Sequence, residues 1–441
     1  MKNIKLYRLI FLVAIGFLLA GLNAGFAQKN HSDSSKFEWF GNAKLGIFIH
    51  WGIYSVQGID ESWSFYNDLV SYDDYMKQLQ GFTASNYHPE EWAKLIKESG
   101  AQYAVITSKH HDGVALWDSR FSNLNVVKKT PAGRDLLKPF VKSLRKEKLK
   151  LGIYYSLLDW SHPNYPNFTR KEKRYESDSL RWEKFVKFNF GQIGEFMDNY
   201  KPDLVWFDGD WEQSAEKWRA KEIRELLIKK NKDVIINSRL QGYGDYATPE
   251  QGLPIHKPKD KYWELCMTMN DSWGYQGNDK NYKTPYQVIR IFSDVISGGG
   301  NLLLDIGPKA DGSIPPEQVT ILKELGKWTS KHNQAIFGAN AGIPRDYFDG
   351  PSTISKNGNI LYLFVTGKPN GPIMLKGLTN KINNIWVVGT GVKLDHDIKM
   401  KAWWSKIPGL VFIDIPDTTL DEYITVIALQ LEGDKIDLFD L

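Results

Sequence analysis

Carboxyl, imidazole and aromatic groups follow several short apolar runs of this sequence. The run Leu204–Phe207 is rich in β-forming residues, and Asp208-Gly209-Asp210 follows it directly. A buried carboxylate costs several kcal/mol unless it is paired or hydrogen-bonded, so a buried strand that delivers one to a turn is unusual. The carboxyl ends of strands carry the chemistry in α/β barrels, which makes Asp208 a candidate catalytic residue. Capping the next helix is the alternative role for a single Asp.

Other apolar runs end in groups that could act with Asp208. They contribute His50, His110, His111, Tyr154 and Arg239, and the run before Asp208 itself contributes Trp206. One such ending carries little information, but several that meet on the same face of a barrel would form a site.

The three histidines allow two kinds of chemistry. Together with an Asp they could bind zinc or a similar ion. Neutral imidazoles can equally donate hydrogen bonds to sugar hydroxyls. Neighbouring side chains on a strand point in opposite directions, so His110 and His111 can face one cavity only if they lie in a loop. The Asp208-Gly209-Asp210 sequence could also indicate a nucleotide-sugar and metal site, but no phosphate-binding glycine loop supports that interpretation.

Strands and helices that must position these groups alternate along the chain. Strands are predicted at Lys44–Trp51, Tyr103–Thr107, Leu151–Ser156, Asp203–Phe207, Val234–Asn237, Tyr262–Thr268 and Asn301–Ile306. Amphipathic helices are predicted at Pro89–Ser99, Asp135–Glu147, Arg181–Tyr200, Ala215–Asn231, Thr284–Ser297 and Glu317–Phe337. This alternation over roughly 300 residues predicts a parallel sheet, and the length favours a (β/α)₈ barrel over residues 28–345.

Two regions depart from this alternation. Arg239–Lys261 is rich in Gly, Pro and Asp without a helical period, so one barrel helix could be missing there. After residue 345, short strands are separated by Asn-Gly and Pro-Asp turns, which predicts a C-terminal antiparallel β-sandwich over residues 346–441. These strands are Asn359–Val365, Ile385–Val388, Leu410–Ile415 and Ile424–Leu431.

The N-terminus predicts export, to the periplasm or outside the cell. Residues 1–27 combine a basic start, an apolar run over Leu9–Leu22 and a small-residue cleavage site at Ala27. No second apolar run of that kind follows, so no membrane span is expected in the mature chain. Removal of this signal peptide takes three positive charges and no acidic residues, so the net charge falls from +4 to +1. A near-neutral chain gives no electrostatic reason to expect nucleic acid as a partner.

The composition points to carbohydrate without proving it. Sixteen Trp and 13% aromatic residues could stack on the apolar faces of sugars or fill a large core. The single Cys266 excludes an internal disulfide and a cysteine-based zinc site.

Several motifs occur in an order that is typical of one enzyme family. They are KLGIFIHWGIYSV, YAVITSKHHDGVALWDS, KLGIYYSLLDW, VWFDGDW, INSRL followed by GDYATPEQ, and SGGGNLLLDIGP followed by DGSIP. On these motifs the chain resembles the exo-acting α-L-fucosidases of glycoside hydrolase family 29 over most of residues 36–340. The resemblance implies a retaining mechanism through a covalent fucosyl-enzyme and a fucosylated oligosaccharide or glycoconjugate as substrate. It implies no metal and no cofactor.

The resemblance also implies roles for individual residues. Asp208 takes the position of the nucleophile, and the fucose pocket would be lined by His50, His110, His111, Tyr154, Trp206 and Arg239. The family often has adjacent Glu-Trp after the first strand, whereas this chain has Glu61-Ser62-Trp63. Trp63 is therefore expected in the aromatic role, and the role of Glu61 stays open. Trp273 could form a wall of the pocket or simply pack.

The acid/base is the second carboxyl group that a retaining glycosidase needs, about 5–5.5 Å from the nucleophile. Glu250 lies in the irregular region, close to where relatives place this residue, and Glu264 lies on the next predicted strand. We favour Glu250 over Glu264, with Asp279 as a further candidate. A related sugar such as α-L-galactose, or sugar binding without catalysis on the same fold, are the alternative functions.

Overall fold

The computed structural model describes residues 34–440, so the predicted signal peptide at residues 1–27 lies outside the described residues. The described part begins with a 3₁₀ helix η1 (Ser34–Phe37) and the helix α2 (Glu38–Ala43). Within residues 34–440, no helix is both long enough and apolar enough to cross a membrane.

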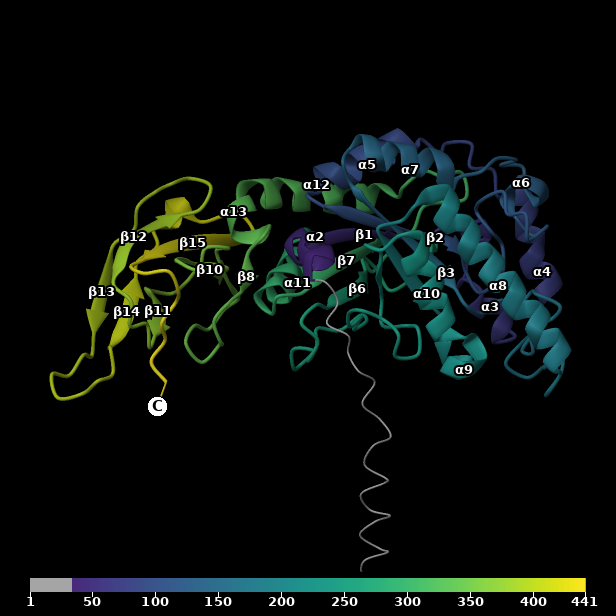
Figure 1. Cartoon of the computed structure of the whole chain (residues 1–441). Coiled ribbons are helices and arrows are strands. Elements are labelled where there is room, and N and C mark those ends of the chain that lie inside the picture. The colour runs from purple at the N-terminus through teal and green to yellow at the C-terminus, as the bar shows by residue number, and fades with distance from the viewer. Residues whose placement is uncertain (1–33, 441) are drawn as a thin grey trace, which may run out of the picture. The chain divides into compact units, whose positions relative to one another are not determined.

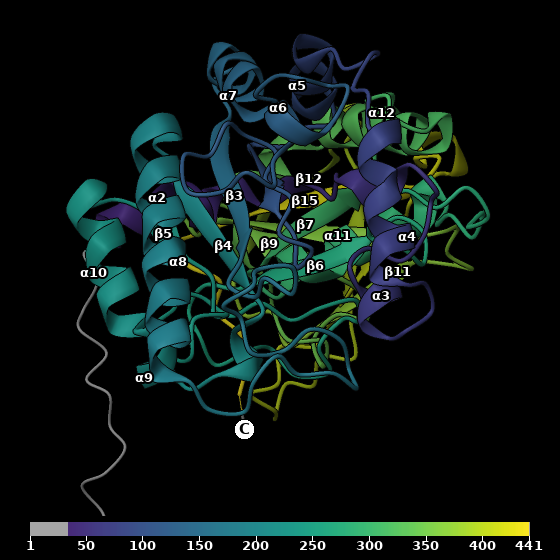
Figure 2. The ribbon, with the colours of Figure 1, turned by 90° about the vertical axis from the view of Figure 1, so that its right-hand side faces the viewer.

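A seven-stranded parallel sheet forms the centre of the larger part of the chain (Figures 1 and 2). Its strand order is β5-β4-β3-β2-β1-β7-β6, with β1 hydrogen-bonded between β2 and β7. Each predicted strand of this region overlaps one observed strand, and β7 matches its prediction to the residue. The strands are β1 (Leu45–Ile49), β2 (Tyr103–Lys109), β3 (Lys150–Ser156), β4 (Leu204–Asp208), β5 (Ile235–Ile236), β6 (Glu264–Thr268) and β7 (Asn301–Ile306).

An irregular segment, residues 246–250, takes the place of an eighth strand. Isolated parallel bridges join Tyr246 to Asn237 beyond β5, and Glu250 to Cys266 in β6. Pro249 accepts a hydrogen bond from the amide of Cys266 but has no N–H to donate, so a regular ladder cannot form here. The predicted eight-fold barrel is thus confirmed in part, as seven regular parallel strands with an irregular segment between the two edge strands.

Within the described residues, six long helices accompany the sheet, and each packs on the next in the order α10, α8, α7, α5, α12, α11. This order follows the order of the strands, as expected when each helix connects two parallel neighbours. No helix lies in the described residues between β5 and β6. This agrees with the expectation that the region Arg239–Lys261 could lack a barrel helix. The helices are α5 (Pro89–Glu98), α7 (Leu137–Lys146), α8 (Ser179–Tyr200), α10 (Ala220–Lys230), α11 (Pro285–Ser297) and α12 (Pro316–Lys331).

Shorter helices complete the helical part of the chain. Two predicted helices are each divided: α9 is separated from α10 at Arg219, whose φ of +54° is left-handed, and α12 is separated from α13 at His332. The short elements are η2 (Ile53–Ser55), α3 (Trp63–Tyr66), α4 (Tyr72–Met76), η3 (Lys77–Gly81), α6 (Val126–Lys129), η4 (Asp210–Glu212), α9 (Ala215–Trp218), α13 (Asn333–Ile336) and η5 (Asp417–Thr419).

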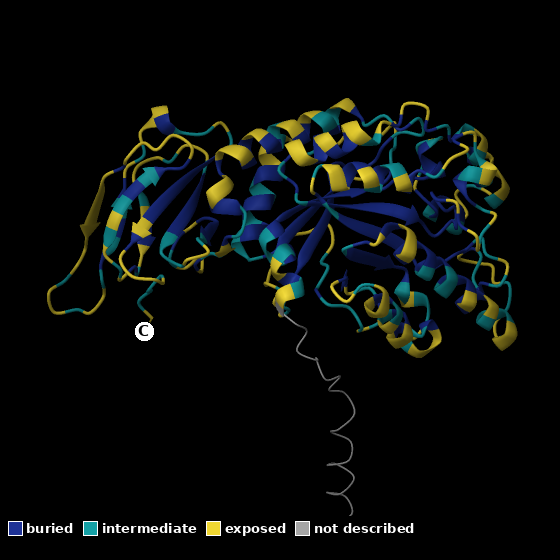
Figure 3. Cartoon of the chain, turned by 45° about the horizontal axis from the view of Figure 1, so that its top comes forward, coloured by how far each residue is buried: buried dark blue, intermediate teal, exposed yellow. Residues whose placement is uncertain are grey.

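Successive side chains of β4 point to opposite faces of the sheet, which shows how the sheet positions functional groups. Val205 and Phe207 belong to the large hydrophobic core, whereas Trp206 and Asp208 point to the other side of the strand. All residues of β4 are buried, and the strands of the central sheet are drawn as buried almost throughout in Figure 3. A polar group at a strand end is therefore held by a rigid support.

The C-terminal strands form two antiparallel sheets, with the orders β12-β15-β10-β9-β8 and β11-β14-β13. In β10, Tyr362 and Phe364 belong to the large hydrophobic core of the parallel sheet and its helices. Leu361, Leu363 and Val365 belong to a second apolar cluster, which also contains residues of the sheet β11-β14-β13. The predicted antiparallel strands are confirmed, and the domain boundary after residue 345 stays a prediction. The strands are β8 (Asn340–Ala341), β9 (Ser352–Ile354), β10 (Ile360–Thr366), β11 (Ile373–Lys376), β12 (Ile382–Val387), β13 (His396–Lys399), β14 (Leu410–Ile413) and β15 (Ile424–Leu431).

Candidate active site

A cavity of about 180 Å³ opens at the carboxyl ends of the parallel strands. Polar and aromatic side chains from β1, β3 and β4 and from the loops between the other strands share its wall. The cavity is lined by Phe48, His50, Glu61, Trp63, His110, Tyr154, Trp206, Asp208, Trp211, Arg239, Glu250 and Trp273.

Asp208 is the last residue of β4, and its carboxylate is held from two sides. Arg239 Nη1 donates to Oδ1 at 2.7 Å, and the Tyr154 hydroxyl donates to Oδ2 at 2.9 Å. His111 Nε2 lies 3.7 Å from Oδ2, beyond hydrogen-bond distance. Donors contact both carboxylate oxygens, so this side chain has a defined orientation.

One guanidinium links Asp208 to a second carboxylate. Arg239 donates through Nη1 to Asp208 and through Nη2 to Glu250, and it lies over the ring of Trp206 at 4.6 Å. Although burial acts to lower the pKa of Arg239, the charge of Asp208 raises it above its ordinary value, so the guanidinium stays cationic. Asp210 supports this arrangement because its carboxylate accepts from the backbone N–H of Gln241, two residues after Arg239.

Glu264, the other candidate acid, lies at the start of β6 and is fully buried in the interior of the sheet. It accepts hydrogen bonds from the Tyr103 hydroxyl at 2.5 Å, the Trp206 indole N–H at 3.0 Å and the Tyr246 hydroxyl at 3.3 Å. Burial raises the pKa of Glu264 to about 7, against the opposing effect of these donors. Its carboxyl group thus holds Trp206 and two tyrosines, while Glu250 lines the cavity.

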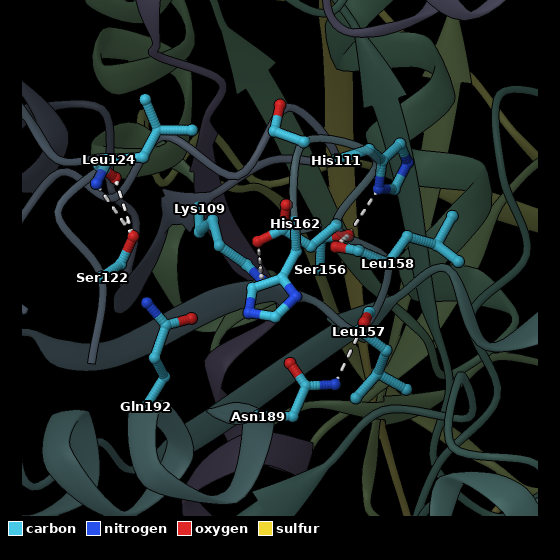
Figure 4. Close-up of polar contacts among 12 residues, drawn as sticks. Lys109, His111, Ser122, Leu124, Ser156, Leu157, Leu158, His162, Asn189 and Gln192 are labelled. Carbon is cyan, nitrogen blue, oxygen red and sulfur yellow. Dashed lines mark hydrogen bonds and ion pairs between the residues drawn. The ribbon is translucent and has the colours of Figure 1, made fainter. Parts of the chain in front are cut away.

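Each of the three predicted histidines uses one ring nitrogen to bond a neighbour. His50 Nδ1 is 2.7 Å from Asp305 Oδ1, His110 Nδ1 bonds to Ser62, and His111 Nδ1 is 2.6 Å from Ser156 Oγ. Figure 4 shows His111 and Ser156 joined in this way. Burial lowers the pKa of all three imidazoles well below the ordinary value, so they are neutral at physiological pH.

The placement of the histidines differs, although all three meet near Asp208. His50 and His110 line the cavity, whereas His111 lies close to Asp208 without lining the cavity. His110 and His111 follow the end of β2 and lie in a loop, but only His110 lines the cavity. In the described residues 34–440, no group of three or more His, Cys, Asp or Glu side chains is arranged to hold a metal ion.

Aromatic rings form the apolar walls of the cavity. Phe48 packs on Trp206 with ring centroids 5.0 Å apart, and Trp273 lies at the same distance from His50. Trp63 stacks with Trp211, whose exposed fraction of 49% places it at the mouth. Ring faces of this kind suit the C–H faces of a sugar.

Sequence reasoning missed residues of this wall and Asp305, which bonds His50. It did not single out Phe48, Trp211 or Asp305, and it left Glu61 and Trp273 open. Phe48 is two residues before His50 on β1, so the two-residue period of a strand could have identified it. Asp305 lies within the predicted strand Asn301–Ile306, where a buried carboxylate was a usable signal.

Glu61 is buried in the cavity wall just before α3. Its carboxyl accepts from the backbone N–H of Gly274, in the loop that carries Trp273. Burial raises the pKa of Glu61 to about 7. The glutamate thus connects two loops at the cavity and presents a group that can be protonated near neutral pH.

The cavity holds two carboxyl groups between aromatic walls at the carboxyl ends of parallel strands. Such a pair is what a glycoside hydrolase requires. The comparisons with known proteins support this class. The family model described as Alpha-L-fucosidase matches residues 23–334, so the chain belongs to this family, glycoside hydrolase family 29.

Individual relatives agree with the family match. Tissue alpha-L-fucosidase of Rattus norvegicus is 34% identical over 333 residues, which is 68% of this chain and 70% of the relative. The structure of alpha-L-fucosidase isoenzyme 1 from Paenibacillus thiaminolyticus gives a TM-score of 0.83 at 33% identity, over 91% of this chain and 99% of that one. A second structure is a family 29 alpha-L-fucosidase from Bacteroides thetaiotaomicron, trapped as a covalent intermediate with 2-fluoro-fucosyl fluoride in a Glu-to-Gln mutant. It gives a TM-score of 0.81 at 27% identity, over 93% of this chain and 99% of that one.

Proposed function

We propose that this chain is an exo-acting, retaining α-L-fucosidase in which Asp208 is the nucleophile and Glu250 the acid/base. The observation that carries the proposal is the bridge of Asp208, Arg239 and Glu250 at the cavity. A retaining glycosidase needs two carboxyl groups about 5–5.5 Å apart, and two carboxylates bound to one guanidinium are held close together. Trapping of a covalent intermediate in a family member is consistent with this mechanism.

In the first step, an Asp208 oxygen attacks the anomeric carbon of the bound fucose. Glu250 gives its proton to the glycosidic oxygen as the bond to the leaving group breaks, so the leaving group departs as a neutral alcohol. The hydrogen bonds from Arg239 and Tyr154 orient the carboxylate for this attack. The product of the step is a fucosyl ester on Asp208.

In the second step, water enters the place of the leaving group. Glu250, now a carboxylate, takes a proton from this water as the water oxygen attacks the anomeric carbon. The ester bond breaks, Asp208 is released as a carboxylate, and Glu250 is protonated again. Two displacements on the same carbon restore its original configuration.

The cavity supports a terminal sugar as substrate. His50 and His110 offer ring nitrogens to hydroxyl groups, and Phe48, Trp206 and Trp273 offer apolar walls to a ring face and a C6 methyl group. We further propose that residues 1–27 direct export, which would place the enzyme in the periplasm or outside the cell with access to fucosylated glycans.

The direct test is hydrolysis of an aryl α-L-fucoside followed by proton NMR at early times. With a nitrophenyl fucoside, the proposal expects release of nitrophenol. It also expects α-L-fucose to be the first anomer to appear, before mutarotation mixes the two anomers. The matched aryl α-L-galactoside differs from the fucoside by one hydroxyl on C6, and slower hydrolysis of it would support an apolar C6 pocket. Appearance of the β-anomer first would contradict a retaining mechanism.

A further inference from the structure

The loop between β13 and β14 carries a surface that glycoside hydrolysis does not use. Trp403, Met400 and Trp404 are 92%, 79% and 75% exposed, and Ile398 in β13 and Ile407 in the loop are about half exposed. We call these five residues the loop patch. Clustered exposed apolar side chains of this size are uncommon on a soluble surface and mark sites of interaction.

The fold itself does not need the loop patch. Val411 and Ile413, which follow it in β14, are buried in the core between the two C-terminal sheets. All four residues of β13 are exposed, and the loop extends past the end of the sheet (Figures 1 and 3). The patch can therefore meet an external surface without any rearrangement of the core.

The charge of the loop indicates which kind of external surface the patch binds. Lys401 and Lys406 are exposed among the apolar residues, and the sequence has no acidic residue from Ile398 to Ile413. Lys399 is paired with Asp397 at 3.6 Å, so Lys401 and Lys406 carry the outward positive charge. This combination suits an anionic bilayer surface. Trp rings can lie at the depth of the headgroups, aliphatic side chains can reach the boundary of the acyl chains, and Lys side chains can contact lipid phosphates.

A sugar chain and a second copy of this protein fit less well. The rings of Trp403 and Trp404 meet at 89°, so they do not form a flat platform for successive sugar rings. Residues 398–409 also contain no carboxylate or amide side chain to bond sugar hydroxyls. A symmetric contact between two copies would bring Lys401 and Lys406 of both chains into one apolar interface, where like charges repel.

We propose that the loop patch, with Lys401 and Lys406, docks this enzyme on an anionic lipid bilayer as a peripheral contact. The contact holds the enzyme at the membrane surface without spanning it. It is independent of the catalytic assignments, because no residue of the loop lines the cavity described above.

Co-sedimentation with vesicles tests the proposal, using phosphatidylcholine alone and phosphatidylcholine mixed with phosphatidylglycerol. The variants are Trp403→Ala/Trp404→Ala and Lys401→Ala/Lys406→Ala. The matched control is Leu180→Ala, which removes a side chain of 76% exposed fraction on α8. Any contribution of residues 1–27 is common to all variants and cancels in the comparison.

The original chain should bind the mixed vesicles, and the Trp variant should bind them roughly tenfold or more weakly. The Lys variant should lose most of its preference for phosphatidylglycerol and its sensitivity to salt. Leu180→Ala should bind as the original chain does, and all variants should hydrolyse an aryl fucoside at the original rate.

Three results would overturn the proposal. The first is vesicle binding that the Trp variant leaves unchanged. The second is an absence of vesicle binding together with a Trp-dependent affinity for a fucosylated polysaccharide. The third is an absence of vesicle binding together with a fall in molecular mass in solution when the Trp pair is removed, which would assign the patch to self-association.

Discussion

Asp208 and Glu250 bond to the same guanidinium, yet the chain holds them in different ways. Asp208 ends a regular strand that pairs with β3 along its whole length, and its side chain is 12% exposed. Glu250 lies on the irregular segment 246–250, joined to β6 by an isolated bridge, and its side chain is 39% exposed. A nucleophile needs a fixed position, whereas an acid that later activates water needs access to solvent and room to move.

Replacing Asp208 should have the largest effect. Asp208→Ala removes the attacking carboxylate, so kcat for an aryl α-L-fucoside should fall by on the order of 10⁴-fold or more. Azide can enter the space and attack the anomeric carbon, so it should restore part of the rate and give a fucosyl azide. An unchanged circular dichroism spectrum is the control for folding, and a folded variant without azide rescue would point to a different nucleophile.

Replacing Glu250 should separate substrates by leaving group. Glu250→Ala removes the proton donor, so hydrolysis of natural glycosides should fall by on the order of 10²–10⁴-fold. The phenolate of an activated aryl fucoside leaves without needing a proton, so the first step on this substrate should slow far less. Pre-steady-state and steady-state rates on both substrates measure this difference. If Glu264→Ala gives this pattern and Glu250→Ala does not, the two glutamates exchange roles.

Arg239→Lys tests whether one guanidinium must serve both carboxylates. A lysine ammonium lacks the two separate Nη groups that reach Asp208 and Glu250, so at least one charge-assisted hydrogen bond is lost. A hydrogen bond to a charged group contributes about 1.5–3 kcal/mol, which predicts a fall in kcat/KM of roughly 10- to 100-fold. Arg345→Lys, at a surface ion pair with Asp294, is the matched control and should leave the rate unchanged. An equal effect of both variants would exclude a special role for the bridge.

Glu264→Gln should have the smallest effect on activity and a measurable one on stability. The pKa of Glu264 is raised to about 7 from 4.5, so between these values the folded chain holds a proton that the unfolded chain has lost. The free energy of unfolding therefore falls as pH rises through this window, by on the order of 3 kcal/mol for this group. The variant should show a flatter dependence of Tm on pH from 4.5 to 7, with kcat within a few-fold. An unchanged slope would contradict a buried, protonatable Glu264.

Local patterns were enough to predict much of the fold and to single out Asp208 as a candidate catalytic residue. The strand Asn301–Ile306 was predicted to the residue, because a short apolar run between glycine-rich segments permits little else. Asp208 was identifiable because the strand and the turn that define it are adjacent in the sequence.

The acid could not be assigned in the same way. Whether Glu250 or Glu264 reaches the cavity depends on how the segment 246–250 bridges β5 and β6, and no local pattern encodes that register. Pro249 interrupts the ladder, so the two-residue period of a strand gives no guide there. Asp305 was within a correctly predicted strand, but its contact with His50 joins β7 to the end of β1, which is distant in the sequence.

The most direct test of the account is to trap the intermediate with 2-fluoro-fucosyl fluoride and to map the label by mass spectrometry of proteolytic peptides. The account predicts one 2-fluoro-fucosyl ester, on Asp208, which forms in the original chain and turns over more slowly in Glu250→Ala. A label on another carboxylate, or no label while the enzyme is inactivated, would contradict it.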